Sequence, residues 1–303
     1  PEVLRFTQDG SGESDIDGKS CVIKVSHPEQ ELSHPERSEG SLVCLYRLKM
    51  LKKITLRKQH AIIIKLRSRR KLRRLEMGLD DQVMPFIDQA NIACGFHAGD
   101  PIVMKKTLLS AKGHNVVVGA HPSYPDLAGF GRRSMSLPAA EIIAIVEYQI
   151  AALAGMAENI DMPITYVKPH GALYNDMMAN GHIRSAVMEA IAGSHLPLAF
   201  MLQATPDAET HRQEAEMFGL ELIFEAFADR CYDDNGALLS RAKEGAVHSR
   251  EKMLAQVSQL KNDGSVTTIS GHRLELQADS LCVHGDNIDG VNAIEEIRQL
   301  INL

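Results

Sequence analysis

The chain has 303 residues, a formal net charge of −6, five cysteines and no tryptophan, and 44% of its residues are hydrophobic. This composition allows one large domain or two ordinary ones, and it excludes collagen-like, disulfide-rich and wholly disordered chains. No apolar run approaches the roughly eighteen residues of a membrane span and the first residues are polar, so we expect a cytoplasmic protein without signal peptide or membrane contact.

The charge is unevenly distributed along the chain. Residues 1–50 sum to −3, residues 51–75 carry eleven Lys or Arg and no acid, and residues 76–303 sum to −14. We expect residues 1–49 to be a disordered or non-native extension, because they combine linker-like Gly-Ser residues and prolines with little hydrophobic periodicity. The basic run could bind nucleic acid or be a solvated tail or helix extension. Since it contains no aromatic residue for base stacking, we expect no nucleic-acid partner.

From Met77 onward, short apolar runs alternate with amphipathic stretches at the spacing of repeated strand–helix units. The expected strands are 90–96, 116–120, 164–168, 198–203, 220–224 and 280–283. The expected helices are 101–113, 137–158, 176–193, 206–218, 249–262 and 287–301, with a small hairpin over 266–277. Nearly unbroken apolar strands between helices indicate a parallel sheet buried on both faces. The absence of a Gly-rich phosphate-binding motif favours a barrel over a doubly wound sheet.

A histidine follows four of the six expected strands: His97, His121, His170 and His284. The carboxyl ends of parallel barrel strands meet on one rim, where active sites are built. Imidazole and carboxylate groups that converge there can bind a metal, relay protons or orient a substrate carboxylate. Each histidine alone would be an ordinary loop residue, but four at equivalent places predict a site.

Neighbouring residues allow two interpretations each. Lys168 is either a surface cation or a buried one that needs a partner, and Asp229-Arg230 is either catalytic or a structural ion pair. The arginines of Gly129–Arg133 meet either an anion or solvent. Because there is no His-x-x-x-His pair, we predict no metal site and keep metal binding as the less favoured alternative.

Five long motifs complete the pattern. They are Asn91–Asp100 (NIACGFHAGD), Gly119–Asp126 (GAHPSYPD) with GFGRR after it, Val167–Asn175 (VKPHGALYN), Phe227–Arg230 (FADR) and Cys282–Asp286 (CVHGD). Together they closely resemble the signatures of the LamB/YcsF family, to which the A subunits of 5-oxoprolinase belong. The resemblance extends over essentially all of 77–303.

The resemblance implies an α/β fold, a distorted parallel (β/α)7 barrel of the glycoside hydrolase and deacetylase type, which we expect over residues 50–303. It also implies ATP-dependent opening of the small-molecule substrate 5-oxo-L-proline to L-glutamate, with ATP and Mg²⁺ as co-substrate and separate B and C subunits as partners. A five-membered lactam is an unstrained amide, so its hydrolysis needs an activated carbonyl oxygen, which phosphorylation supplies. The intermediate must then be shielded from water and attacked in place.

The resemblance and the strand-end positions together suggest roles for individual residues. The expected catalytic residues are Lys168, His170, Asp229 and Arg230: His170 or Asp229 as the base that activates water, and Lys168 and Arg230 as stabilisers of oxyanion or phosphate charge. The expected substrate-binding residues are His97, Asp100, His121, Tyr174, His284 and Asp286.

The start of the barrel departs from the family pattern. Met50–Leu56 resembles the family's first strand and Met77–Asp81 resembles the end of the loop that follows it. The acidic residues expected between them are absent, and the basic stretch 57–76 stands in their place. A shifted reading frame would explain both this stretch and residues 1–49. We expect residues 54–56 or 61–66 to serve as strand one, with the fold retained and the activity weakened.

Two other functions are consistent with the same residues. A metal-dependent deacetylase of sugars or amides would carry stoichiometric zinc or nickel. A non-catalytic scaffold for the B and C subunits would not support ATP hydrolysis that depends on 5-oxoproline.

Overall fold

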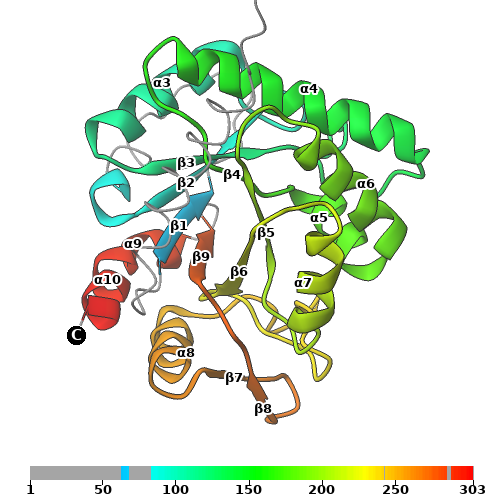
Figure 1. Cartoon of the computed structure of the whole chain (residues 1–303). Coiled ribbons are helices and arrows are strands. Elements are labelled where there is room, and N and C mark those ends of the chain that lie inside the picture. The colour runs from blue at the N-terminus through cyan, green and yellow to red at the C-terminus, as the bar shows by residue number, and fades with distance from the viewer. Residues whose placement is uncertain (1–62, 68–82, 242, 285–287, 303) are drawn as a thin grey trace, which may run out of the picture. The chain divides into compact units, whose positions relative to one another are not determined.

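The computed structural model describes residues 63–67, 83–241, 243–284 and 288–302. The predictions for residues 1–49, for the possible strand 54–56 and for Asp286 therefore lie outside the described residues. The described residues form a barrel with its surrounding helices, which is drawn in colour in Figure 1.

Seven parallel strands close into a barrel, in the order β1-β2-β3-β4-β5-β6-β9 (Figure 1). Their bounds are β1 Ile63–Arg67, β2 Gln89–Ala93, β3 Val117–His121, β4 Tyr166–Val167, β5 Ala199–Gln203, β6 Leu222–Phe227 and β9 Ser280–His284. The ring closes because β1 pairs with both β2 and β9, and β9 also pairs with β6. The predicted seven-stranded barrel is confirmed, and of the two candidates for strand one, 61–66 is the one that overlaps β1.

Helices lie outside the ring of strands (Figure 1). They are α3 Pro101–Gly113, α4 Ala139–Glu158, α5 Gly171–Ala179, α6 Gly181–Ala192, α7 Ala208–Glu216, α8 Arg250–Asp263, α9 Ile288–Asn292 and α10 Ile294–Asn302, with a 3-10 turn η1 at Met84–Phe86. The predicted hairpin is present as β7 Ser265–Thr267 and β8 Arg273–Glu275, outside the barrel.

Two predicted helices are each divided in the structure. The stretch 176–193 contains the end of α5 and all of α6, because Asn180 adopts an extended backbone (φ −135°, ψ 112°) and its side chain accepts a hydrogen bond from the amide of His182. An Asn at this position ends one helix and caps the next. The stretch 287–301 is likewise divided into α9 and α10.

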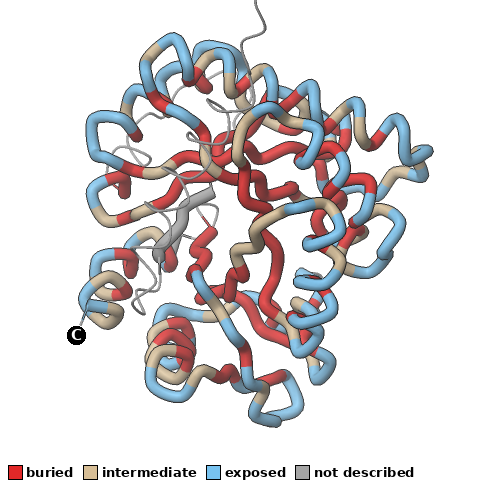
Figure 2. The backbone as a smooth tube through the Cα atoms, in the orientation of Figure 1, coloured by how far each residue is buried: buried red, intermediate tan, exposed pale blue. Residues whose placement is uncertain are grey.

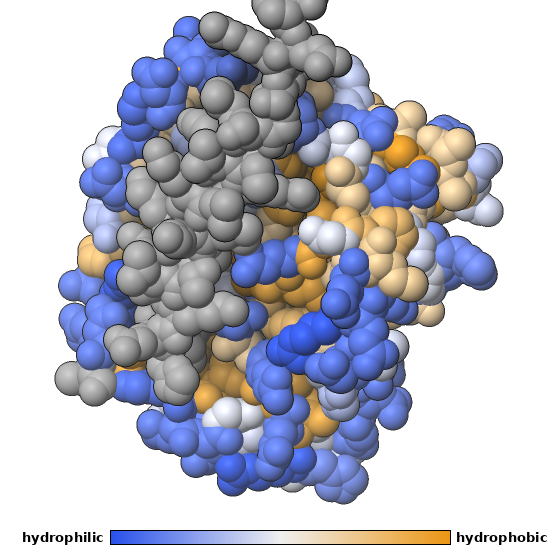
Figure 3. All heavy atoms as spheres, viewed as in Figure 1, coloured by the Kyte–Doolittle hydropathy of each residue, from blue (hydrophilic) through white to orange (hydrophobic). Residues whose placement is uncertain are grey.

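The strands from β2 to β9 that form the barrel have apolar side chains on both faces and are buried along most of their length (Figure 2). Outward residues pack under the helices, whereas Tyr166, Ala199 and Met201 form a separate cluster with Val117 and Ile223. Side chains alternate between the faces of a strand, so this second cluster fills the barrel interior. In the view of Figure 3, hydrophilic residues cover the outer helices and apolar residues gather toward the middle of the face.

Helix α4 is long and apolar enough to span a membrane, so the expectation that no segment has this character was wrong. Among the described residues, this 20-residue helix alone meets that criterion by length and composition, with a mean hydropathy of 1.5. One of its faces is buried, and the helix packs against α6, α3 and β3. A helix that covers a barrel needs such an apolar stripe for packing, so its composition is weak evidence for a membrane span.

Candidate active site at the carboxyl ends of the strands

The inward-facing positions change character along the barrel. In β3, β4, β5 and β6 they are apolar near the start of the strand, as in the inner cluster around Tyr166, whereas β2 and β9 begin with the buried polar residues Gln89 and Ser280. Toward the carboxyl ends they become polar, and every one of these polar side chains is buried: His121 at the end of β3, Lys168 just after β4, Glu225 within β6 and His284 at the end of β9. Because all the strands run in the same direction, these groups collect at one end of the barrel, as predicted from the sequence.

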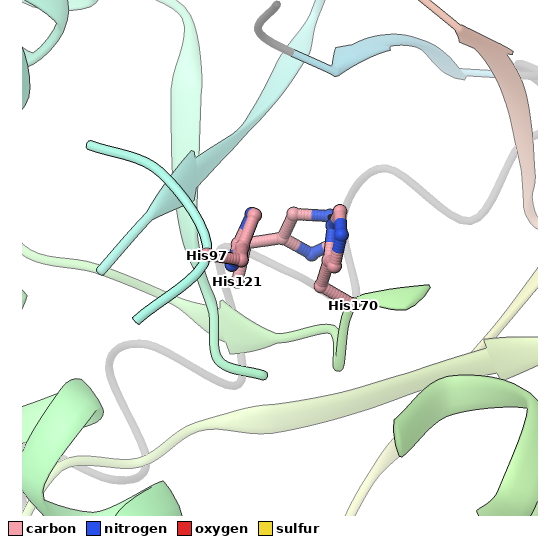
Figure 4. A group of neighbouring side chains, drawn as sticks. All are labelled: His97, His121 and His170. Carbon is pink, nitrogen blue, oxygen red and sulfur yellow. Dashed lines mark hydrogen bonds between the residues drawn. The ribbon is translucent and has the colours of Figure 1, made fainter. Parts of the chain in front are cut away.

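Three histidines form a cluster on one side of this rim (Figure 4). One ring nitrogen from each of His97, His121 and His170 lies within 4.8 Å of the others, and all three residues are buried. The rings of His97 and His170 stack with centroids 3.6 Å apart, and His121 meets His170 edge-on at 4.9 Å. The neighbouring strands β2, β3 and β4 deliver the three residues, which explains why they meet.

The loop after β3 packs against the histidine cluster. Asp126 organises this loop: its carboxylate accepts hydrogen bonds from the Gly129 amide at 2.7 Å and from Arg133 Nε at 3.0 Å. The pKa of Asp126 is lowered to about 2, chiefly by the hydrogen bond from Arg133. The loop then places the Phe130 carbonyl 2.7 Å from His170 Nε2.

Gly131 adopts a left-handed backbone (φ +64°) directly against the histidines. A Cβ at this position would lie 2.8 Å from His170 Cδ2 and 2.9 Å from His97 Cβ. Both the backbone conformation and the close approach therefore require glycine. This is the physical role of the GFGRR motif.

A buried ion pair lies inside the barrel, toward the carboxyl ends of the strands. Lys168 Nζ is 2.6 Å from Glu225 Oε2, and the side chains are 4% and 0% exposed. The hydroxyl of Tyr174 donates to Glu225 Oε1 at 2.7 Å. Burial and the Glu225 carboxylate raise the pKa of Tyr174 well above its ordinary value, so the phenol keeps its proton. Lys168 thus has the partner that burial of a charge demands.

Asp229 and His284 form a second buried hydrogen-bonded pair on the other side of the rim. His284 Nδ1 lies 2.9 Å from Asp229 Oδ1 and 3.1 Å from Oδ2. Burial alone would raise the pKa of Asp229, but attraction to His284 and the hydrogen bond from it outweigh burial and lower the pKa. The His284 ring stacks on Phe227, and Lys168 Nζ lies 5.2 Å from the centroid of the Phe227 ring, so Phe227 contacts both buried pairs.

The structure places two predicted site residues in structural contacts. Arg230 donates to the carbonyls of Leu239 and Ala246, which anchors the loop after β6. Burial, followed by repulsion from Arg241, lowers its pKa. Asp100 is exposed and caps α3, accepting from the amides of Ile102 and Val103 at 2.9 and 3.0 Å. Neither contact reaches the buried groups of the rim.

Sequence reasoning missed Glu225 as a site residue. Its signal was present: a lone carboxylate within the otherwise apolar strand Leu222–Phe227 (LIFEAF). A carboxylate in such a strand must find a cation or a proton. The cation is Lys168, which lies just after β4, a strand that is not adjacent to β6.

Buried imidazoles, carboxylates and a lysine at the carboxyl ends of a parallel barrel define a barrel protein with an enzyme-like rim. More specifically, this chain belongs to the LamB/YcsF family, which matches residues 70–303. The family resemblance seen in the motifs is therefore confirmed.

Relatives cover most of the barrel. The chain is 51% identical over 227 residues to the 5-oxoprolinase A subunit of Pseudomonas fluorescens (strain Pf0-1), and 48% identical over 227 residues to the 5-oxoprolinase A subunit of Vibrio vulnificus (strain YJ016). Each match spans 75% of this chain and 91% of the relative. Among solved structures, a lactam utilization protein from Thermus thermophilus is 31% identical with a TM-score of 0.72, covering 80% of this chain and 97% of that one.

Proposed function

We propose that this chain takes part in the ATP-dependent opening of 5-oxo-L-proline to L-glutamate, with ATP and Mg²⁺ as co-substrate and with B and C subunits as partners. Its family and the names of its relatives support this role. The observation that carries the chemistry is the buried Asp229–His284 pair on the same rim as the Lys168–Glu225 pair. A proton acceptor and a cation are the two groups that hydrolysis of an activated lactam requires.

The proposed reaction begins when ATP transfers its terminal phosphoryl group to the lactam carbonyl oxygen. Water then adds to the carbonyl carbon and loses a proton, and the ring C–N bond breaks as the nitrogen takes up a proton, which gives γ-glutamyl phosphate. A second water hydrolyses this acyl phosphate and frees the phosphate group. The released products are glutamate and inorganic phosphate, together with ADP. Activation is needed because an unstrained amide is a poor electrophile.

His284 and Asp229 are proposed to handle the water proton. A carboxylate on Nδ1 fixes the tautomer that presents Nε2 as the acceptor, and it stabilises the imidazolium that forms. Since His284 makes this contact, Asp229 acts through it, which refines the expectation of Asp229 as the base. His170 stays the alternative base named from the sequence.

Lys168 is proposed to stabilise the negative charge that develops on the carbonyl oxygen or on its phosphoryl group. The ammonium group of Lys168 is hydrogen-bonded to Glu225 and is therefore oriented inside the barrel before substrate binds. A charged group that is oriented in advance stabilises developing charge effectively. Tyr174, His97 and His121 are proposed to face the substrate.

Reconstitution with purified B and C subunits tests the proposal. We expect glutamate formation and phosphate release that depend on 5-oxoproline, with Asp229→Asn and Lys168→Ala each lowering turnover about 10³-fold. Asp161→Asn is the matched control, because Asp161 is exposed in the loop that precedes β4 at the opposite end of the barrel. Full turnover in both site variants, or no turnover with the unaltered chain, would overturn the proposed function.

The histidine cluster favours a second candidate, a metal-dependent deacetylase of sugars or amides. Such an enzyme needs neither ATP nor partner subunits. Release of acetate from an N-acetylated sugar by the purified chain alone would support this candidate over lactam opening.

A further inference from the structure

The hydrogen bonds around the histidine cluster determine where its protons lie. His121 Nδ1 is 2.6 Å from the Lys168 carbonyl oxygen, and His170 Nε2 is 2.7 Å from the Phe130 carbonyl oxygen. A carbonyl oxygen only accepts, so both of these nitrogens carry hydrogen. A neutral imidazole has one N–H, and the second nitrogen of each ring therefore presents a lone pair.

These two lone pairs face each other. His121 Nε2 and His170 Nδ1 lie 3.2 Å apart in a buried position. Two unprotonated nitrogens at this distance repel, and the contact becomes favourable only with a positive charge between them. That charge is either one shared proton or a metal ion.

His97 presents a third lone pair to the same cluster. The Ser123 hydroxyl donates to the Tyr124 carbonyl at 2.9 Å, so its oxygen accepts from His97 Nδ1, also at 2.9 Å. The proton of neutral His97 is thus on Nδ1 and the lone pair on Nε2. All three rings donate to protein oxygens, which is the outer-shell pattern that orients metal-binding histidines.

We propose that His97, His121 and His170 bind a divalent transition metal of the zinc class. Two nitrogens on a tetrahedral zinc, each at about 2.0–2.1 Å, are about 3.3 Å apart. The 3.2 Å between His121 and His170 matches this spacing. Three neutral imidazoles favour zinc, copper or nickel over magnesium or calcium, which prefer oxygen ligands.

His97 completes the site after a rotation of its ring. Its plane lies 16° from that of His170 at 3.6 Å, and stacked rings direct their lone pairs side by side rather than toward one point. Turning His97 about its side-chain bonds aims Nε2 at the ion. Three protein ligands then leave a fourth position for water or a substrate oxygen.

Metal binding is measured on the purified full-length chain without any substrate. After chelation and removal of the chelator, the chain is titrated with Zn²⁺ by calorimetry and with Co²⁺ by visible absorption, which reports four-coordinate cobalt. We expect one equivalent bound, with His121→Ala and His170→Ala each weakening affinity at least about 100-fold. Ser123→Ala removes only an orienting oxygen, and we expect a loss of about 10- to 100-fold.

His272→Ala is the matched control, because this histidine is 72% exposed on the hairpin side and belongs to no cluster found among the described residues. It should bind the metal as the unaltered chain does. If His121→Ala or His170→Ala does not fold, Ser123→Ala still tests the site. Absence of stoichiometric binding, or equal affinity in the cluster variants and His272→Ala, would overturn the proposal. The charge between His121 and His170 would then be a shared proton. Metal binding without 5-oxoproline turnover would overturn the proposed function alone.

Discussion

The two sides of the barrel rim orient their histidines in different ways. On the side formed by β2, β3 and β4, His121 and His170 donate to backbone carbonyls and His97 donates to a serine hydroxyl. On the side formed by β6 and β9, His284 donates to the carboxylate of Asp229. A carbonyl fixes the direction of a ring without adding charge, whereas a carboxylate also stabilises the protonated ring. The first side is therefore suited to holding a ligand through lone pairs and the second to moving a proton.

The largest effect should come from breaking the proton-moving pair. His284→Ala should lower turnover in the reconstituted system by about 10⁴-fold, because it removes the proposed proton acceptor. The double variant His284→Ala/Asp229→Asn should be no worse than His284→Ala, since Asp229 acts only through the ring. Independent, multiplying losses in steady-state kinetics would contradict the assignment of these two residues to one unit.

The buried ion pair under the rim should dominate stability. Lys168→Met removes the Lys168 cation from the buried Glu225 carboxylate and should lower the free energy of unfolding by about 3–5 kcal/mol. Lys168→Met/Glu225→Leu should recover much of that loss in urea denaturation while turnover stays abolished. The exposed pair Arg250–Glu296 is the control, and Arg250→Ala should cost less than about 1 kcal/mol. A double variant as unstable as the single would mean that packing, rather than the unpaired charge, sets the cost.

The ligand-holding side should be sensitive to the shape of its loop. Gly131→Ala forces a Cβ into the His97–His170 stack and into a positive φ, and we expect a loss of about 2–3 kcal/mol together with weaker metal binding. Gly155→Ala is the control. Gly155 is at an exposed position of α4, no atom beyond its own helix backbone lies within 4 Å of its Cβ position, and the substitution should stabilise by about 0.5–1 kcal/mol. Equal effects of the two substitutions in thermal denaturation would refute the role of Gly131.

The carboxylate that organises this loop predicts a pH dependence. The pKa of Asp126 is lowered from 3.8 to about 2, so its stabilising effect is complete above about pH 5 and is lost as the pH falls through 2. Asp126→Asn should therefore cost about 2 kcal/mol at neutral pH, and the difference from the unaltered chain should shrink toward pH 2. Urea midpoints at pH 7 and pH 3 check this expectation, and a difference independent of pH would contradict it.

The smallest effect separates a helix cap from a substrate contact. Asp100→Ala should lower stability by about 1 kcal/mol, while Asp100→Asn should keep the cap and the full stability. Turnover should be unchanged in both variants if Asp100 only caps α3. A large loss of turnover in Asp100→Asn would restore it to the substrate-binding residues.

Much of the barrel could be read from local patterns. The apolar runs predicted the strands of the barrel with small errors at their ends, because a strand buried on both faces has few polar positions. The division between α5 and α6 was missed, since the backbone at Asn180 turns within a sequence that otherwise has helical character. The apolar character of α4 as a whole was underestimated, because a long helix that packs against a barrel can be as apolar as a membrane span.

The site was predictable as a set of residues but not as a set of contacts. The order of residues along the chain places His121 and His284 at the ends of strands and His97 and His170 a few residues after strands, so their positions could be predicted without the structure. The contact among three of these histidines and the pairing of the fourth with Asp229 depend on how the strands are arranged around the barrel. The reason is the closure of the barrel. The strands β2, β3 and β4 lie side by side, and β9 pairs with β6 because the β7–β8 hairpin between them in sequence is not part of the barrel. The same closure brings Glu225 to Lys168 across the interior, a contact between residues 57 positions apart.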